Sequence, residues 1–107
     1  MRYHDFFVDR VGGHASVIDI GCGYGAVAHS IAERTSAAVV GIDLDAASIA
    51  MARARFAHPR LAFIHGDALR ELPGRRFEVI VLSNVLEHIE HRVDFLRALP
   101  ALDQRCY

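Results

Sequence analysis

A run of glycines and a later aspartate could together bind a ligand that contains a ribose. Gly21, Gly23 and Gly25 follow one short apolar segment, and Asp43 ends the next one. Glycines permit a sharp turn from strand to helix and let a ligand approach the backbone, because no Cβ stands in the way. The free amides of the helix that follows favour an anionic group. A carboxylate at the position of Asp43 can accept hydrogen bonds from ribose hydroxyls.

Each of these features also has a purely structural interpretation. The glycines could form a tight turn that binds nothing, and Asp43 could cap the following helix. Asp45 is better placed for that cap, because its carboxylate can accept from the amides of the first helical turn. Cys22 lies inside the turn. We expect a small packing residue there, although the helix N-terminus could lower the pKa of its thiol.

The elements that position these residues alternate between strands and helices. Short apolar segments predict strands over residues 15–20, 37–43, 61–65 and 77–82. Helical spacing of apolar residues predicts helices over 3–11, 26–34, 46–57 and 85–99. With a short helix before the fourth strand, this alternation is typical of an α/β fold, a doubly wound parallel sheet covered on both faces.

Ligands of such sheets bind outside the carboxyl ends of the strands. The segments that could hold a ligand all fall there, at residues 21–25, 43, 66–68 and 83–84. This convergence of glycines, carboxylates and small polar residues at one edge of the sheet is what the pattern alone predicts.

Four motifs taken together resemble those of the class I S-adenosylmethionine-dependent methyltransferases. They are VIDIGCGYG at 17–25, GIDLD at 41–45, FIHGDA at 63–68 and FEVIVLSNVLEHI at 77–89. The resemblance runs from about Phe6 to Leu99. It implies a Rossmann-like sheet of seven strands, of which this chain would supply the first four in the order 3-2-1-4. We therefore expect residues 1–107 to be a single, truncated domain that binds S-adenosylmethionine.

The resemblance implies a role for each residue of the glycine motif. Gly21, Gly23 and Gly25, with Cys22 between them, would shape the turn under the methionine part of the cofactor. Asp19 would brace this turn and orient the amino group of the cofactor, directly or through water.

The resemblance also implies contacts to the adenosine part of the cofactor. Asp43 would bind the ribose hydroxyls, and Leu44 would lie against the adenine. Asp67 would accept a hydrogen bond from the adenine amine, and the Ala68 amide would donate to a ring nitrogen. The alternative for Asp67 is a plain turn residue after a glycine.

The segment after the fourth strand could carry catalytic or metal-binding groups. The resemblance places Ser83 and Asn84 near the methionine end of the cofactor. His88 could act as a general base near neutral pH, but we favour a role for Glu87 and His88 in fixing the loop. In some relatives a carboxylate at the position of Asn84 helps to bind a metal ion. An amide is a poorer ligand for a hard cation, so we expect no metal and assign no catalytic residue.

Three functions are compatible with the sequence. The first is a methyltransferase that acts on a small molecule. The second is an NAD(P)-binding oxidoreductase, because residues 21–26 also fit G-x-G-x-x-A, although the segments after the third and fourth strands would then be unexplained. The third is a module that binds the cofactor or a partner without catalysis, which the short length supports.

Composition narrows the setting and the partners. The chain of 107 residues has 12 basic and 13 acidic residues, which gives no basic footprint for a nucleic acid. It has no lysine, which excludes a Schiff base. Two cysteines and no apolar run of the ~20 residues that a membrane helix needs favour the cytoplasm. The apolar fourth strand would form an exposed edge, and it could pair with a second copy of the chain.

Overall fold

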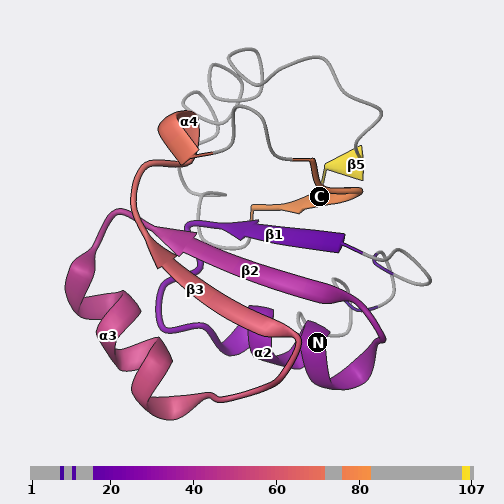
Figure 1. Cartoon of the computed structure of the whole chain (residues 1–107), viewed down its shortest axis with the longest axis horizontal. Helices are drawn as coiled ribbons and strands as arrows, with labels where there is room; N and C mark the ends of the chain where they lie inside the picture. The colour runs from indigo at the N-terminus through magenta and orange to yellow at the C-terminus, as the bar shows by residue number, and fades with distance from the viewer. Residues whose placement is uncertain (1–7, 9–10, 12–15, 72–75, 83–104, 107) are drawn as a thin grey trace.

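The fold is built on one parallel sheet, shown in the computed structural model of Figure 1. The structure describes residues 8, 11, 16–71, 76–82 and 105–106. Within these residues the strands are β1 (Ser16–Ile20), β2 (Ala38–Asp43), β3 (Leu61–His65), β4 (Val79–Val81) and β5 (Arg105–Cys106). They are all paired in parallel, in the order β3-β2-β1-β4-β5. The predicted order 3-2-1-4 and the α/β class are confirmed.

The helices cover both faces of the sheet. Among the described residues they are α2 (Ala26–Arg34), α3 (Ala46–Arg55) and α4 (Ala68–Glu71). In Figure 1, α2 and α3 lie on one face and α4 lies on the other. No helix in this part of the chain combines the length and the apolar character needed to cross a membrane.

Alternation along the strands produces two apolar cores. Successive side chains of a strand point to opposite faces. Val17 and Val79 therefore belong to the core on the side of α2 and α3, which also contains Ile31 of α2. Ile18 and Ile80 belong to the core on the opposite face. Because both faces of β1 and β4 are buried, these strands consist largely of β-branched residues.

The fourth strand differs from its prediction. β4 is shorter than the expected strand over 77–82 and pairs with β1 at Val79, Ile80 and Val81. Its other side pairs with β5, where Val79 and Ile80 face Arg105 and Cys106. The expectation that the fourth strand is an exposed edge is therefore wrong. The two residues of β5, Arg-Cys, show no strand pattern, so the sequence does not indicate this pairing.

Smaller differences concern the ends of helices. α3 ends at Arg55 rather than at residue 57, because Phe56 has an extended backbone. Val8 and Val11 are both helical, as predicted, and pack on the core beside α2. The rest of the helix expected over 3–11, and that expected over 85–99, lie outside the described residues.

Candidate functional site

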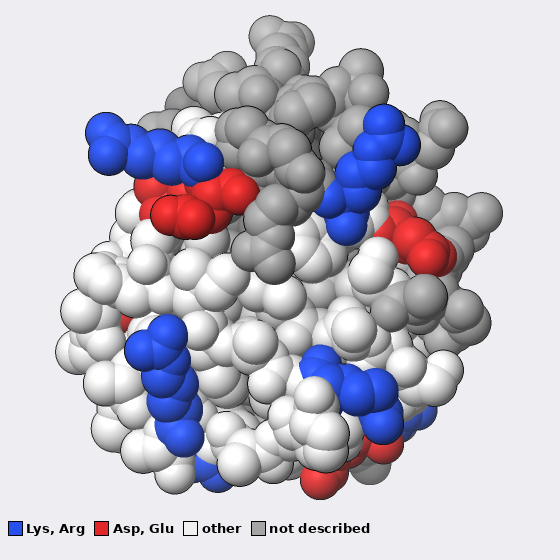
Figure 2. Space-filling model, in the orientation of Figure 1, with Lys and Arg blue, Asp and Glu red and all other residues white. Residues whose placement is uncertain are grey.

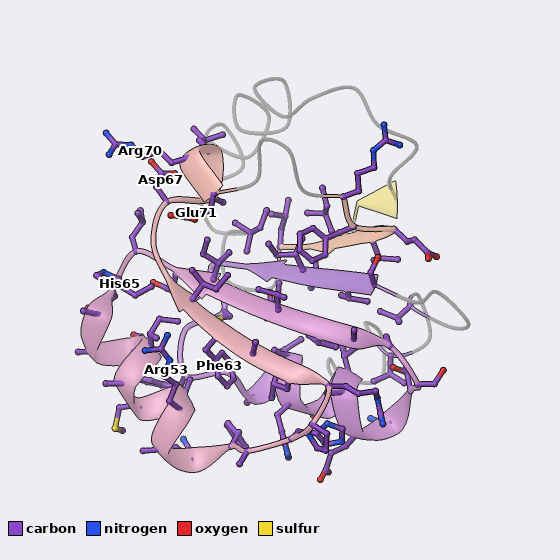
Figure 3. The ribbon with its side chains drawn as sticks, viewed as in Figure 1. Arg53, Phe63, His65, Asp67, Arg70 and Glu71 are labelled. Carbon is purple, nitrogen blue, oxygen red and sulfur yellow. The ribbon has the colours of Figure 1, made fainter. Side chains whose placement is uncertain are left out.

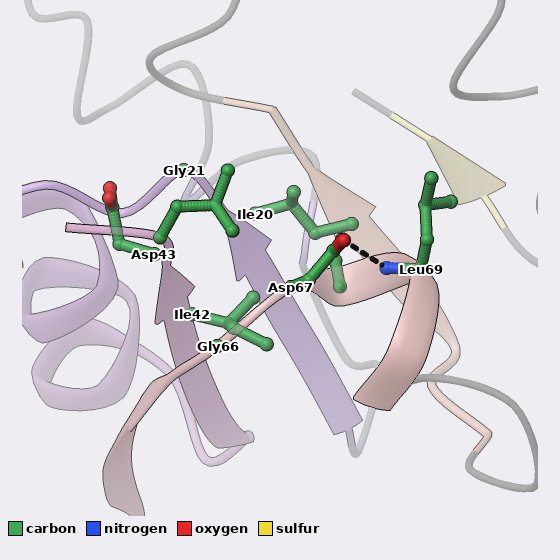
Figure 4. A pocket seen from close by; sticks show the side chains of 9 residues that line it. Ile20, Gly21, Ile42, Asp43, Gly66, Asp67 and Leu69 are labelled. Atoms are coloured by element: carbon green, nitrogen blue, oxygen red, sulfur yellow. Dashed lines mark hydrogen bonds between the residues drawn. The ribbon is translucent and has the colours of Figure 1, made fainter.

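A pocket opens at the carboxyl ends of β1, β2 and β3 (Figure 4). Its volume of about 380 Å³ falls within the range of roughly 300–1,000 Å³ that small-molecule sites have. The residues that line it are Ile20, Gly21, Ile42, Asp43, Leu44, Gly66, Asp67, Ala68 and Leu69. The pocket therefore lies where the pattern of strands and helices predicts a ligand.

The glycine turn forms one wall of the site, between β1 and α2. Gly21, Gly23 and Gly25 have φ angles of 73°, 57° and 88°, which strain any residue that has a Cβ. The amides of Gly21 and Cys22 donate to the Ile42 carbonyl at 2.8 and 3.1 Å. The turn is thus fixed to the end of β2, and α2 begins directly after Gly25.

Asp43 links the turn to the loop before α3. Its Oδ2 accepts a hydrogen bond from the Gly23 amide at 2.8 Å, and its Oδ1 accepts one from the Asp45 amide at 2.8 Å. A carboxylate has about four lone-pair sites, so these two bonds leave acceptor capacity for hydroxyl groups of a ligand. The sequence did not indicate that Asp43 braces the glycine turn.

Asp45, rather than Asp43, is the N-cap residue of α3, as predicted. Its carboxylate makes no hydrogen bond that caps the helix. Instead, Oδ2 accepts the hydroxyl of Ser48 at 2.7 Å. This hydroxyl is the main cause that lowers the pKa of Asp45, and the amides of Ala47 and Ser48 contribute to lowering it. The side chain of Asp45 is exposed and does not line the pocket.

The segment after β3 forms the opposite wall. Asp67 Oδ1 accepts the Leu69 amide at 2.9 Å, the bond drawn in Figure 4. Asp67 therefore has the turn role considered as its alternative, at the start of α4, and its carboxylate also faces the pocket. Leu44 and Leu69 are 72% and 43% exposed at the mouth of the pocket. They offer apolar surface that a planar ring could cover.

His65 supports this region from the end of β3. Its Nε2 lies 3.1 Å from the Leu44 carbonyl oxygen, and Figure 3 shows its side chain beside the start of α3. The histidine thus joins the loop after β2 to β3.

Cys22 belongs to the turn and Asp19 to the end of β1, and neither lines the pocket. Asp19 is fully buried, and Cys22 is 3% exposed. Burial, with smaller contributions from the negative charges of Asp19 and Asp43, raises the pKa of the Cys22 thiol to about 12. The lowering that the helix N-terminus could have caused does not occur, because the loss of solvation and the two carboxylates raise the pKa. Cys22 is a packing residue, as predicted.

The structure brings together most of the predicted site residues that it describes. Five of them line the pocket: Gly21, Asp43, Leu44, Asp67 and Ala68. Four others lie in the turn or at the end of β1 that leads into it: Asp19, Cys22, Gly23 and Gly25. The remaining four, Ser83, Asn84, Glu87 and His88, lie outside the described residues.

Sequence reasoning missed three apolar residues that line the pocket. Ile20 and Ile42 are the last or next-to-last residues of β1 and β2, and Leu69 is in the first turn of α4. The position of Ile20 and Ile42 at strand ends was a usable signal, because a ligand at that edge contacts the side chains at the ends of the strands.

These residues fit the adenosine part of S-adenosylmethionine. The turn exposes backbone without a Cβ at Gly21, the carboxylates of Asp43 and Asp67 can accept from hydroxyl and amine groups, and the floor is apolar at Ile20 and Ile42. On the face drawn in Figure 2, the described arginines stand apart from one another instead of forming one basic patch.

Comparison with known proteins gives a consistent family. The sequence model of the methyltransferase domain matches residues 17–102. The chain is 37% identical over 79 residues to an uncharacterized methyltransferase of Mycobacterium tuberculosis, covering 73% of this chain and 40% of the relative. It is 32% identical over 105 residues to a ubiquinone biosynthesis O-methyltransferase of Neisseria meningitidis, covering 89% and 44%.

Solved structures share the fold. A S-adenosylmethionine-dependent methyltransferase from Thiobacillus denitrificans, in complex with S-adenosyl-L-homocysteine, matches with a TM-score of 0.70 at 21% identity, over 94% of this chain and 44% of that one. Magnesium protoporphyrin IX methyltransferase from Synechocystis, with bound S-adenosylmethionine, matches with a TM-score of 0.71 at 22% identity, over 89% and 50%.

The matches cover much more of this chain than of its relatives. The chain spans about two fifths of the length of the curated relatives named above. The family model covers most of the chain, and the strand order contains the order 3-2-1-4 expected from the resemblance. The chain therefore belongs to the class I S-adenosylmethionine-dependent methyltransferases.

Proposed function

We propose that this chain forms the cofactor-binding part of a methyltransferase that transfers a methyl group from S-adenosylmethionine to a small molecule. The observation that carries this proposal is the Asp43 carboxylate. The Gly23 amide holds it at 2.8 Å, on the rim of a pocket that also includes Gly21 and Asp67. One site thus contains a carboxylate that can accept hydrogen bonds from ribose hydroxyls, a glycine turn without Cβ atoms and a second carboxylate.

Each wall of the pocket would hold one part of the cofactor. Asp43 would accept from the ribose hydroxyls, and Leu44 with Leu69 would enclose the adenine. Asp67 would accept from the adenine amine, and the Ala68 amide would donate to a ring nitrogen. The donor and acceptor types on the pocket lining support these roles.

The glycine turn would lie under the methionine part of the cofactor. Its glycines with positive φ angles leave backbone surface that no side chain covers. Asp19 would act from below, as a buried carboxylate that braces the turn. Ser83 and Asn84 would lie near the methionine end of the cofactor.

The cofactor supplies an activated methyl group on a sulfonium, so the chain contributes mainly position and a dry environment. Ile20 and Ile42, which line the pocket, would keep water away from the bound cofactor. A base is needed only where the acceptor is bound with its proton, and we assign this role to no residue of the chain.

A small-molecule acceptor is supported by the Neisseria relative, which is an O-methyltransferase of ubiquinone biosynthesis. The balance of 12 basic and 13 acidic residues also favours a small acceptor over a polyanion. We place the protein in the cytoplasm on its low cysteine content. We propose no pairing with a second copy of the chain. That expectation required a free edge on β4, and β5 pairs with this edge.

Calorimetric titration tests the proposal. S-adenosyl-L-homocysteine and NADH are titrated separately into the chain, into Asp43→Ala and into Asp45→Ala. We expect saturable binding of S-adenosyl-L-homocysteine alone. The affinity should fall at least roughly tenfold in Asp43→Ala, because hydrogen bonds to a charged group are lost, and stay unchanged in Asp45→Ala, whose side chain is outside the pocket. Binding of NADH instead would support an oxidoreductase and overturn the proposal.

A further inference from the structure

The ring of Phe63 lies directly beneath the glycine turn, although Phe63 belongs to β3, two strands away from it. A Cβ added to Gly25 would lie 2.6 Å from Cζ and 2.7 Å from Cε1 of Phe63. Carbon atoms normally pack at about 3.5–4.0 Å. The ring therefore occupies the space that a side chain at Gly25 would need. Figure 3 shows Phe63 on the α3 side of the sheet.

A glycine in the middle of β2 makes this reach possible. Phe63 is paired with Gly41 across β2 and β3, and Gly41 is paired with Asp19 across β1 and β2. A Cβ at Gly41 would lie 2.9 Å from Cδ1 of Phe63 and 3.0 Å from Sγ of Cys22. The missing side chain of Gly41 thus leaves a space that the Phe63 ring and the Cys22 thiol fill together.

The turn is consequently held from two sides. On the β2 side, the amides of Gly21, Cys22 and Gly23 donate to the Ile42 carbonyl and to Asp43. On the lower side, the Phe63 ring fills the space below the Cα of Gly25. The ring is 8% exposed and does not line the pocket.

We propose that Phe63 is a positioning residue for the cofactor, which acts through Gly25 and Cys22 by supporting the glycine turn from below. The inference rests on the proposed function, since the turn is the part expected to contact the methionine moiety. A smaller side chain at position 63 would leave a cavity under the turn. The turn would then lose apolar contact while it keeps its hydrogen bonds to β2, and it would sample conformations in which its backbone no longer fits against the ligand.

Two measurements on Phe63→Leu test this proposal. One is the affinity for S-adenosyl-L-homocysteine, and the other is amide hydrogen exchange of residues 21–25 without ligand. Val39→Ala is the matched control, because Val39 is also buried in the same core but lies near the amino end of β2. We expect Phe63→Leu to weaken binding roughly tenfold and to speed exchange in the turn. Val39→Ala should lower the midpoint of thermal unfolding without either effect.

A second variant tests the packing itself. Gly41→Ala should weaken binding alone, because the new methyl group meets Phe63 and Cys22. Combined with Phe63→Leu, which makes room, it should cost less than the sum of the two single changes. The proposal is overturned if Phe63→Leu behaves as Val39→Ala does in both measurements, or if the two changes simply add. If the unaltered chain binds no S-adenosyl-L-homocysteine, the proposed function fails, and the exchange rates still decide the role of Phe63.

Discussion

The carboxylate of Asp43 combines two tasks at the scale of a single residue. It accepts the Gly23 and Asp45 amides, and it borders the pocket. The first task fixes the orientation of the carboxylate before any ligand arrives. Such preorganisation lowers the entropic cost of binding, because the group has no freedom left to lose.

A substitution of Leu44 tests whether the exposed apolar surface at the mouth of the pocket contacts a ligand. Its side chain is 72% exposed, so it contributes little to the stability of the fold. Leu44→Ser should weaken binding of S-adenosyl-L-homocysteine by about 5- to 10-fold, through loss of apolar contact with the adenine. The midpoint of thermal unfolding should stay almost unchanged. Both are measurable by calorimetry.

Met51→Ser is the control for this change, because Met51 is also apolar and 48% exposed but lies on α3 outside the pocket. It should leave the affinity as it is. Equal losses in the two variants would contradict a specific contact of Leu44.

The buried thiol of Cys22 predicts a dependence of stability on pH. Its pKa is raised from 9.0 to about 12 in the folded chain. Above pH 9 the unfolded chain loses this proton while the folded chain keeps it, so the free energy of unfolding should fall as the pH rises from 9 toward 12. Chemical denaturation at a series of pH values measures this fall.

Cys22→Ala isolates the contribution of this thiol, since the second cysteine and the tyrosines are present in both chains. The variant should lose less stability than the unaltered chain over the same range of pH. In addition, iodoacetamide at pH 8 should label Cys22 only slowly until denaturant is added. Rapid labelling of Cys22 in the folded chain, located by peptide mapping to separate it from Cys106, would contradict the burial of this thiol.

At the scale of the elements, the side chain of Arg60 connects a helix to a strand and does not line the pocket. Its guanidinium donates to the carbonyls of Ala32 and Thr35, at 2.7 and 2.9 Å, and to that of Ala37 at 3.3 Å. These carbonyls belong to the end of α2 and to the segment that leads into β2. A cation at a helix C-terminus is also favoured by the helix dipole. One residue before β3 thus holds the connection between α2 and β2.

Arg60→Ala should therefore destabilise the fold by about 1–3 kcal/mol, because it removes charged donors from three backbone carbonyls. Thermal unfolding measures the loss. Binding of S-adenosyl-L-homocysteine at a temperature well below the transition should not change. Arg55→Ala offers a comparison, since Arg55 lies over the Phe56 ring at 5.3 Å and should contribute less. An equal effect of both changes would show that general charge, not the three bonds, matters.

Elements with a strong periodicity could be predicted from the sequence. The apolar runs of β1, β2 and β3 and the helical spacing of α2 lie within one residue of their predicted bounds. β5 could not be predicted, because Arg105 and Cys106 form a strand only through pairing with β4. The support of the turn by Phe63 was also hidden, since it depends on the register that places Phe63 beside Gly41.

At the scale of the whole molecule, β5 protects the outer side of β4. A chain shortened by residues 105–107 loses the pairing of Val79 and Ile80 with β5. It should expose an apolar strand edge and associate with itself more strongly than the full chain at equal concentration. Size-exclusion chromatography with light scattering would show this. An unchanged mass distribution would mean that β5 does not guard this edge.

The proposed function requires a cofactor bound at the carboxyl edge of the sheet. The most direct measurement is a titration of the ¹⁵N-labelled chain with S-adenosyl-L-homocysteine, followed by the chemical shift of each backbone amide. We predict shifts that saturate and that concentrate in residues 20–25, 42–45 and 66–69, while the amino ends of β2 and β3 stay unchanged. Shifts spread over the opposite edge of the sheet, or none in a chain that is folded, would contradict the account.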